Sequence, residues 1–234
     1  GGSGMDDTID KRITLTEAVA RYVTDGCSIA FSGISSREPV AAAYEIMRQG
    51  KRNLTFVTDS SADTAELLIA GGCLSRLESA YVWVGVIGQG FNFRRAVEEG
   101  VPNYLEIEEY SNLGISARFM AGACGLPFMP TRSMLGSDIV AGNPRIRVID
   151  DPYGSGPVAL VPASRPDVAF IHVHRADMAG NAQIWGMLMN DDNLARAVEK
   201  TVLLCEEIIA TEEIRKIPNM TVIPSYCVDA VVEM

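Results

Sequence analysis

Three segments of the chain place side chains that could bind a small anionic or acyl ligand directly after an apolar stretch. In residues 32–38, Gly33 permits close backbone approach, and Ser35, Ser36 and Arg37 offer donors to a carboxylate or phosphate. An ordinary strand-to-helix turn with a serine cap accounts for the same residues. The sequence leaves both interpretations open.

The second segment, residues 85–92, carries glycines in the spacing G-x-x-G-x-G together with Gln89 and Asn92. A dinucleotide fingerprint requires G-x-G-x-x-G, and no lysine follows in the position that a phosphate-binding loop needs. The segment therefore supports neither a dinucleotide site nor a P-loop. Its backbone amides could line another ligand, and a tight turn explains the glycines equally well.

The third segment, residues 105–112, brings Glu106, Glu108 and Glu109 to the start of a helix. Carboxylates are favoured there by the helix dipole for purely structural reasons. A carboxylate nucleophile would need a dry setting rich in hydrogen-bond donors, and the neighbouring residues give no local sign of one.

Two histidines, His172 and His174, lie on one face of an expected strand and could form a metal pair. No third ligand of clear spacing follows, so we expect no metal site. No G-x-S-x-G elbow is present either, so a hydrolase triad is unsupported. These residues together indicate a pocket without an obvious nucleophile.

The elements that must position these segments alternate between strand and helix in the first half of the chain. Thr14 and Glu17 have the spacing of a capping box, and apolar residues recur behind them at helical intervals. The pattern predicts helices over residues 15–24, 39–49, 64–70, 93–99 and 110–124, and strands over residues 27–31, 54–58, 80–86 and 104–107. Such alternation is typical of a doubly wound α/β fold, whose ligands bind at the carboxyl ends of the strands.

After residue 126 the apolar segments become shorter and prolines and glycines more frequent. We expect more hairpins there, so that the mostly parallel sheet becomes mixed. The predicted elements are strands over residues 157–161, 168–173, 182–185, 201–210 and 228–232, and a helix over 193–200. Residues 5–234 are expected to form a single domain, and residues 1–4 resemble an expression linker.

Composition excludes several classes of protein. A net charge of −10 argues against sequence-independent nucleic-acid binding, which needs clustered lysine and arginine. The five cysteines lie far apart without a C-x-x-C pair, which indicates reduced thiols rather than disulfides or a zinc ribbon. The sequence contains no apolar run long enough for a membrane helix and no signal-peptide pattern, so we expect a cytoplasmic protein with no membrane partner.

Residues 94–112 and 125–138 resemble a known family. They read Arg-Arg-Ala-Val-Glu-Glu-Gly through Tyr-Leu-Glu-Ile-Glu-Glu-Tyr-Ser-Asn, and Gly-Leu-Pro-Phe-Met-Pro-Thr-Arg-Ser-Met-Leu-Gly-Ser-Asp. This block is similar to the A-type subunit of family I CoA-transferases, in particular the glutaconate CoA-transferase branch. Residues 172–181 and 209–213 agree more weakly, and Ser32-Gly33-Ile34 replaces the family's Gly-Gly-Phe.

The resemblance implies a reaction and a partner. In the family, a glutamate on the B-type partner attacks an acyl-CoA and then carries CoA as a glutamyl thioester, without a metal or redox cofactor. That glutamate stands in a Ser-Glu-Asn-Gly-like segment, which this chain does not contain. We therefore expect no catalytic residue in this chain, coenzyme A as a substrate, and a B-type partner in a heterodimer or heterotetramer.

By analogy with the family, the A-type chain contributes a wall of the acyl pocket. An arginine there offers bidentate recognition of a second carboxylate, which suits a dicarboxylic acid. The residues expected to contact substrate are Gly33, Ser35, Ser36, Arg37, Gln89, Asn92, Ser111, Asn112 and Arg132.

Other functions share this architecture. Some relatives with the same architecture look like ring-opening CoA-thioester hydrolases, and others look like glutaconyl-CoA-type decarboxylases. In the hydrolase branch an acidic residue falls near the position of Asn112, so Asn112 favours a transferase. A non-catalytic ligand-sensing module would predict a DNA-binding segment, which the sequence lacks. Relatives also continue beyond Met234, which suggests a trimmed or lost terminal segment.

Overall fold

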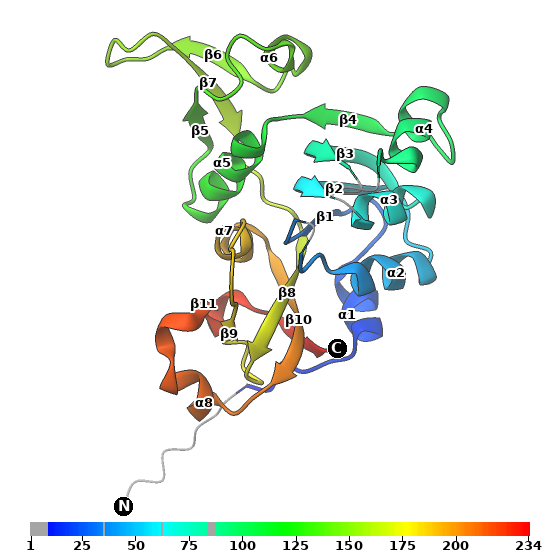
Figure 1. Ribbon diagram of the computed structural model, residues 1–234, viewed down its shortest axis with the longest axis vertical. Coiled ribbons are helices and arrows are strands. Elements are labelled where there is room, and N and C mark those ends of the chain that lie inside the picture. The colour runs from blue at the N-terminus through cyan, green and yellow to red at the C-terminus, as the bar shows by residue number, and fades with distance from the viewer. Residues whose placement is uncertain (1–8, 35, 62, 84–87) are drawn as a thin grey trace, which may run out of the picture.

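The computed structural model describes residues 9–34, 36–61, 63–83 and 88–234, and within these ranges one nine-stranded sheet organises the chain (Figure 1). Seven of its strands run parallel, in the spatial order β4-β3-β2-β1-β8-β10-β12. Two more, β9 and β11, extend the end of β8 in antiparallel register. The predicted α/β fold with a mostly parallel, mixed sheet is confirmed. The strands are β1 (Ser28–Phe31), β2 (Leu54–Ser61), β3 (Leu74–Val82), β4 (Glu106–Glu109), β8 (Val168–Ala176), β9 (Ala182–Gln183), β10 (Lys200–Ile208), β11 (Thr221–Ile223) and β12 (Ala230–Glu233).

The central strands are apolar on both faces, which explains why helices cover the sheet on both sides. On β8, Val168 and Phe170 face one hydrophobic core, whereas Ala169 and Ile171 face the other. Because successive side chains of a strand point to opposite faces, a continuous apolar run fills two cores at once. Phe31 packs edge-on against Phe170 with ring centroids 5.7 Å apart in the first core.

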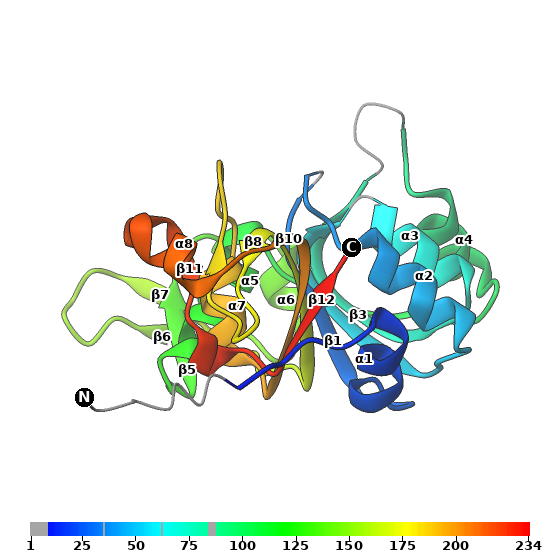
Figure 2. The same ribbon diagram turned by 90° about the horizontal axis from the view of Figure 1, so that it is seen from below.

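Helices form a layer on each side (Figures 1 and 2). One layer contains α1 (Leu15–Tyr22), α2 (Val40–Arg48), α3 (Asp63–Ala70) and α4 (Phe91–Glu99). The other contains α5 (Asn112–Ala123) and α7 (Asp191–Ala197). The capping box predicted for Thr14 and Glu17 is present at the start of α1. None of the helices in the described ranges is both long and apolar enough to cross a bilayer.

Beyond α5 the chain forms a separate antiparallel sheet in the order β5-β7-β6. Its strands are β5 (Phe128–Thr131), β7 (Pro157–Pro162) and β6 (Arg147–Asp150), and two short helices, α6 (Asp138–Gly142) and α8 (Thr211–Lys216), complete the fold. Of these three strands the sequence pattern predicts only β7, because β6 is exposed along its whole length and carries no alternating pattern.

The prediction for β3 was wrong at its start. The apolar pattern placed the strand over residues 80–86, whereas β3 begins at Leu74. Arg76 and Glu78 lie inside the strand and form ion pairs there, so the charges conceal its first half. The end of that predicted strand, the linker predicted over residues 1–4 and the candidate Ser35 lie outside the described residues.

Candidate functional site

The loops that follow β1, β2, β3 and β4 meet at one edge of the sheet, because these strands are parallel. The segment between β9 and α7 rises on the same side as the segment after β1 (Figure 2). Three of these loops hold the residues predicted at positions 33–37, 89–92 and 111–112.

Two consecutive residues at the start of α7 tie these loops together. The Nδ2 of Asn190 donates to Oδ2 of Asp59, near the end of β2, at 2.6 Å, and to Oγ of Ser116 in α5 at 3.1 Å. Asp191 accepts from Arg37, in the loop after β1, with 3.0 Å between Nη1 and Oδ1. A single turn therefore links the loop after β1, strand β2 and helix α5.

Arg37 lies inside the protein rather than reaching toward solvent. Its Nη1 also donates to the carbonyl of His172 at 3.0 Å, and its Nη2 donates to the carbonyl of Met187 at 2.9 Å. The side chain of Arg37 is 9% exposed and that of Asp191 is fully buried. Both terminal nitrogens are thus occupied, and the predicted contact of Arg37 with a substrate carboxylate stays a prediction.

The start of α5 lies against the end of β2. Oγ of Ser60 donates to Oδ1 of Asn112 at 2.8 Å. Ser111 caps the helix by accepting from the backbone N–H of Gly114 at 3.0 Å, and its hydroxyl pairs with that of Ser133 at 2.6 Å. Asn112 therefore belongs to the same polar cluster as Asp59, and Ser111 connects that cluster to the loop after β5.

Gly33 makes the turn after β1 possible. Its φ is +86°, and a Cβ built on it would lie 2.5 Å from the carbonyl oxygen of Ser36 and 2.7 Å from that of Arg37. No side chain fits at that distance, so the loop folds back on itself only with glycine at this position.

Burial sets the electrostatics of this edge. It raises the pKa of Asp59, which is 6% exposed, and the hydrogen bonds from the backbone of Ser60 and from Asn190 oppose that rise. Burial lowers the pKa of His174, whose Nδ1 accepts from the backbone N–H of Trp185 at 3.2 Å. The ring of Trp185 stands edge-on to His174 at 5.2 Å.

Three carboxylates at this edge, those of Asp59, Asp191 and Glu38, are engaged within the chain. Asp59 accepts from Ser60 and Asn190, and Asp191 accepts from Arg37 and from the backbone of Met189. Glu38 accepts from the backbone N–H of Thr64 at 3.1 Å and from its hydroxyl at 2.7 Å, at the start of α3. An attacking carboxylate must be accessible and unsatisfied in its ground state, and none of these three meets that requirement.

The remaining predicted residues are more dispersed. Ser36 is exposed at the tip of its loop, and Gln89, which is exposed, forms an isolated bridge with Trp83 after β3. Asn92 lies in the first turn of α4, where its backbone N–H donates to Glu66 at 2.9 Å. Arg132 lies beside the small sheet and donates to the carbonyl of Ser155 at 2.9 Å.

The structure therefore brings Gly33, Arg37, Ser111 and Asn112 to one cluster and leaves Arg132 in the neighbouring sheet. Their contact with substrate stays a prediction. Sequence reasoning did not identify the residues that connect the cluster, which are Asp59, Ser60, Asn190 and Asp191. The signals were a polar run directly after an apolar strand and an Asn-Asp-Asp start to a helix.

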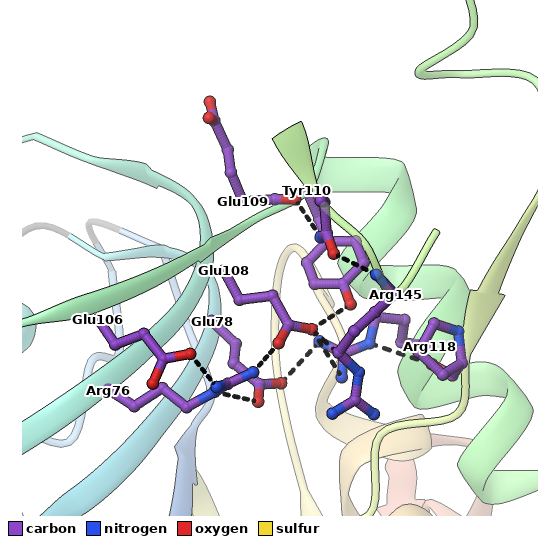
Figure 3. Close-up of polar contacts among 10 residues, drawn as sticks. Arg76, Glu78, Glu106, Glu108, Glu109, Tyr110, Arg118 and Arg145 are labelled. Carbon is purple, nitrogen blue, oxygen red and sulfur yellow. Dashed lines mark hydrogen bonds and ion pairs between the residues drawn. The ribbon is translucent and has the colours of Figure 1, made fainter. Parts of the chain in front are cut away.

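The acidic segment after residue 105 has a structural role (Figure 3). Glu106 and Glu108 form ion pairs with Arg76 of β3, and Glu108 also accepts from the hydroxyl of Tyr110. Arg118, which is 2% exposed, pairs with Glu78 at 2.8 Å. The carboxylates of Glu106 and Glu108 are thus neutralised by arginines and join β3, β4 and α5. A cavity of about 440 Å³ lies between β4 and residues 138–145 beside this network.

The two histidines of β8 do not converge. Nε2 of His172 lies 2.8 Å from Oε1 of Glu206, whereas His174 accepts from Trp185. Within the described ranges, no group of three or more histidine, cysteine, aspartate or glutamate residues has a geometry suited to a metal ion.

Comparisons with known proteins agree with this architecture. A family model described as "Coenzyme A transferase" matches residues 12–234. A protein of Archaeoglobus fulgidus is 42% identical over 96% of this chain, which spans about half (50%) of that relative's length. The A-type subunit of 3-oxoadipate CoA-transferase from Pseudomonas knackmussii is 39% identical, and the match covers 94% of this chain and 77% of that subunit's length.

A solved structure gives the same result in three dimensions. Glutaconate coenzyme A-transferase from Acidaminococcus fermentans superposes with a TM-score of 0.89 and 35% identity, over 95% of this chain and 75% of that one. The resemblance drawn from residues 94–112 and 125–138 is confirmed. The chain belongs to the coenzyme A transferase family.

Proposed function

We propose that this chain is the A-type subunit of a heteromeric CoA-transferase, which moves CoA between an acyl-CoA and a short carboxylic acid. The partner is a B-type subunit, whose glutamate forms the glutamyl-CoA intermediate. Coenzyme A is a substrate, and the reaction needs no metal or redox cofactor. Dicarboxylic acids are the substrate class that we propose, with Arg132, which is 54% exposed and pairs with Asp151 at 3.4 Å, as the candidate for their second carboxylate.

One observation carries the proposal: the three carboxylates that lie among the polar side chains of the site are already engaged within this chain. These carboxylates, on Glu38, Asp59 and Asp191, each accept two or more hydrogen bonds from this chain. Serine, amide and backbone groups surround them, which suits a wall that orients an acyl group but does not attack it. This arrangement supports a partner subunit as the source of the reacting carboxylate.

Exposed apolar side chains beside the site support a partner at this edge. At the end of β3, Tyr81 and Trp83 stack with ring centroids 5.9 Å apart and are 50% and 38% exposed. Between β9 and α7, Trp185, Met187 and Leu188 are 38%, 67% and 42% exposed. Aromatic and methionine side chains are enriched in protein interfaces, and these five flank the polar cluster.

Reconstitution tests this function. The purified chain, a B-type subunit with a Ser-Glu-Asn-Gly-like segment, and their complex would each be given an acyl-CoA and a panel of short mono- and dicarboxylic acids. We expect new acyl-CoA products, detected by mass spectrometry, from the complex alone. Changing the partner's glutamate to glutamine should abolish the exchange. Robust transfer by the single chain would overturn the proposal.

The same assay separates the alternatives. A thioester or ring-opening hydrolase would release a free acid or a cleaved ring without forming a second acyl-CoA, and a decarboxylase would release carbon dioxide while keeping the thioester. Either result with the active complex would replace transfer as the function. Binding of CoA esters without turnover would indicate a ligand-sensing module.

A further inference from the structure

Arg37 occupies an unusual backbone position. Its φ is +57°, a left-handed conformation that residues other than glycine rarely adopt, at the end of the loop that Gly33 begins. Such a conformation persists only where surrounding contacts hold it. The guanidinium group of Arg37 supplies such contacts.

The guanidinium is held by three separate segments. Its four hydrogen bonds reach the carbonyl of His172 in β8, the carbonyl of Met187 before α7, and both carboxylate oxygens of Asp191, at distances between 2.9 and 3.2 Å. The planar fork matches the carboxylate in a bidentate geometry, which a lysine cannot reproduce. Asp191 is fully buried, so it depends on Arg37 for its counter-charge.

This arrangement argues against direct substrate contact. A substrate carboxylate that recruited Arg37 would have to displace Asp191 and leave that buried carboxylate without a partner. Removing one member of a buried pair is far more costly than losing an exposed contact. The pair is therefore expected to stay intact during turnover.

We infer that Arg37 is a positioning residue, which locks the loop after β1 to residues 184–190 so that the acyl-facing backbone of Gly33 and the apolar side chains beside it keep a fixed arrangement. The inference rests on the proposed function for its catalytic consequence. The lock itself depends only on contacts within this chain, and it replaces the simpler idea of Arg37 as a carboxylate ligand.

Hydrogen exchange on the single chain tests the lock without a partner. In Arg37→Met and in the more conservative Asp191→Asn, backbone amides of residues 184–190 should exchange about tenfold or more faster than in the unmodified chain. Arg94→Met, which breaks an exposed pair with Glu98, is the matched control and should leave this segment unchanged. Unchanged exchange in both test variants would overturn the lock.

Kinetics of the complex with the B-type partner test the effect of the Arg37 lock on catalysis. Positioning predicts that Arg37→Lys and Asp191→Asn lower kcat about 10- to 100-fold with the acceptor KM within about threefold, because misplacement weakens the transition state more than binding. A substrate ligand predicts instead a rise of about tenfold or more in KM for dicarboxylic acceptors, in Arg37→Lys alone. That second pattern would overturn the inference. If the unmodified complex shows no transfer, the proposed function fails while the exchange experiment still decides the lock.

Discussion

The amide of Asn190 lies 2.6 Å from the buried carboxylate of Asp59, although the two residues are 131 positions apart in the chain. We expect Asn190→Asp to place two carboxylates in contact, which raises their pKa values and lowers the free energy of unfolding as they ionise. In urea denaturation, the free energy of unfolding of Asn190→Asp should fall further below that of the unmodified chain at about pH 8 than at about pH 5.

Asn190→Ala is the control for that experiment. It removes the hydrogen bond without adding charge, so it should cost about 1 to 3 kcal/mol and show a weaker dependence on pH. Equal losses for Asn190→Asp at both pH values would show that Asp59 does not sense the added charge.

Gly33 and Gly26 allow a matched test of the turn after β1. Their φ angles are +86° and +84°, but a Cβ on Gly26 would have nothing within 4 Å. Gly26→Ala should therefore cost only the left-handed backbone, about 1 to 2 kcal/mol. Gly33→Ala adds a collision with two carbonyl oxygens, and we expect a further loss of about 1 to 3 kcal/mol in thermal or urea unfolding.

Affinity for the B-type partner gives a second readout for the same pair. The displaced loop of Gly33→Ala should weaken complex formation, whereas Gly26 lies at the opposite edge of the sheet, before β1. Identical stability and partner affinity for the two variants would contradict the tight turn.

The network around Arg118 is expected to stabilise the fold rather than to act on substrate. Arg118 is 2% exposed, pairs with Glu78 and stacks over Tyr110 at 4.3 Å. Arg118→Met should lower the free energy of unfolding by about 3 kcal/mol, since the buried Glu78 then keeps only its pair with Arg76. Chemical denaturation measures the change.

Arg94→Met removes an exposed pair with Glu98 and serves as the comparison. The free energy of unfolding of Arg94→Met should fall by less than about 1 kcal/mol, because solvent screens exposed charges. Similar losses for the two arginine variants would mean that the network contributes no more than a surface pair.

His174 predicts a dependence of stability on pH. Burial holds its pKa below the ordinary value of 6.5, so the unfolded chain takes up the proton first as the pH falls. Its contribution to stability is full above 6.5 and is lost as the pH falls from 6.5 through the lower folded value. His174→Asn, whose side-chain oxygen can still accept from Trp185, should lose less stability between about pH 7.5 and about pH 5.5. Equal losses in the two proteins would contradict this.

Much of the fold follows from local patterns, and the site follows only in part. Apolar runs such as residues 27–31 predicted the central strands, because each run fills two cores. The first half of β3 was hidden, since Arg76 and Glu78 are neutralised by residues about 30 positions away or more. Gly33, Arg37 and Asn112 were predicted from their types and from a family resemblance, and their contact with substrate stays a prediction.

Their connections could not be predicted from the sequence. Asn190 and Asp191 reach Asp59 and Arg37 only because α7 packs beside the carboxyl ends of β1 and β2, and no spacing in the sequence encodes that contact. The pair of Arg37 with Asp191 also changes the role that we infer for Arg37, from a substrate ligand to a positioning residue. The residue type alone suggests a carboxylate ligand, whereas the hydrogen-bond partners show that the guanidinium already holds a carboxylate of this chain.

The most direct test of the central claim is the location of covalently bound CoA. The complex would be incubated with an acyl-CoA in the absence of an acceptor acid, and the intact mass of each chain would then be measured. We expect the B-type chain to gain CoA less one water, as a thioester on its glutamate, while this chain keeps its mass. A CoA adduct on this chain would contradict the claim that it provides the wall of the site and its partner provides the nucleophile.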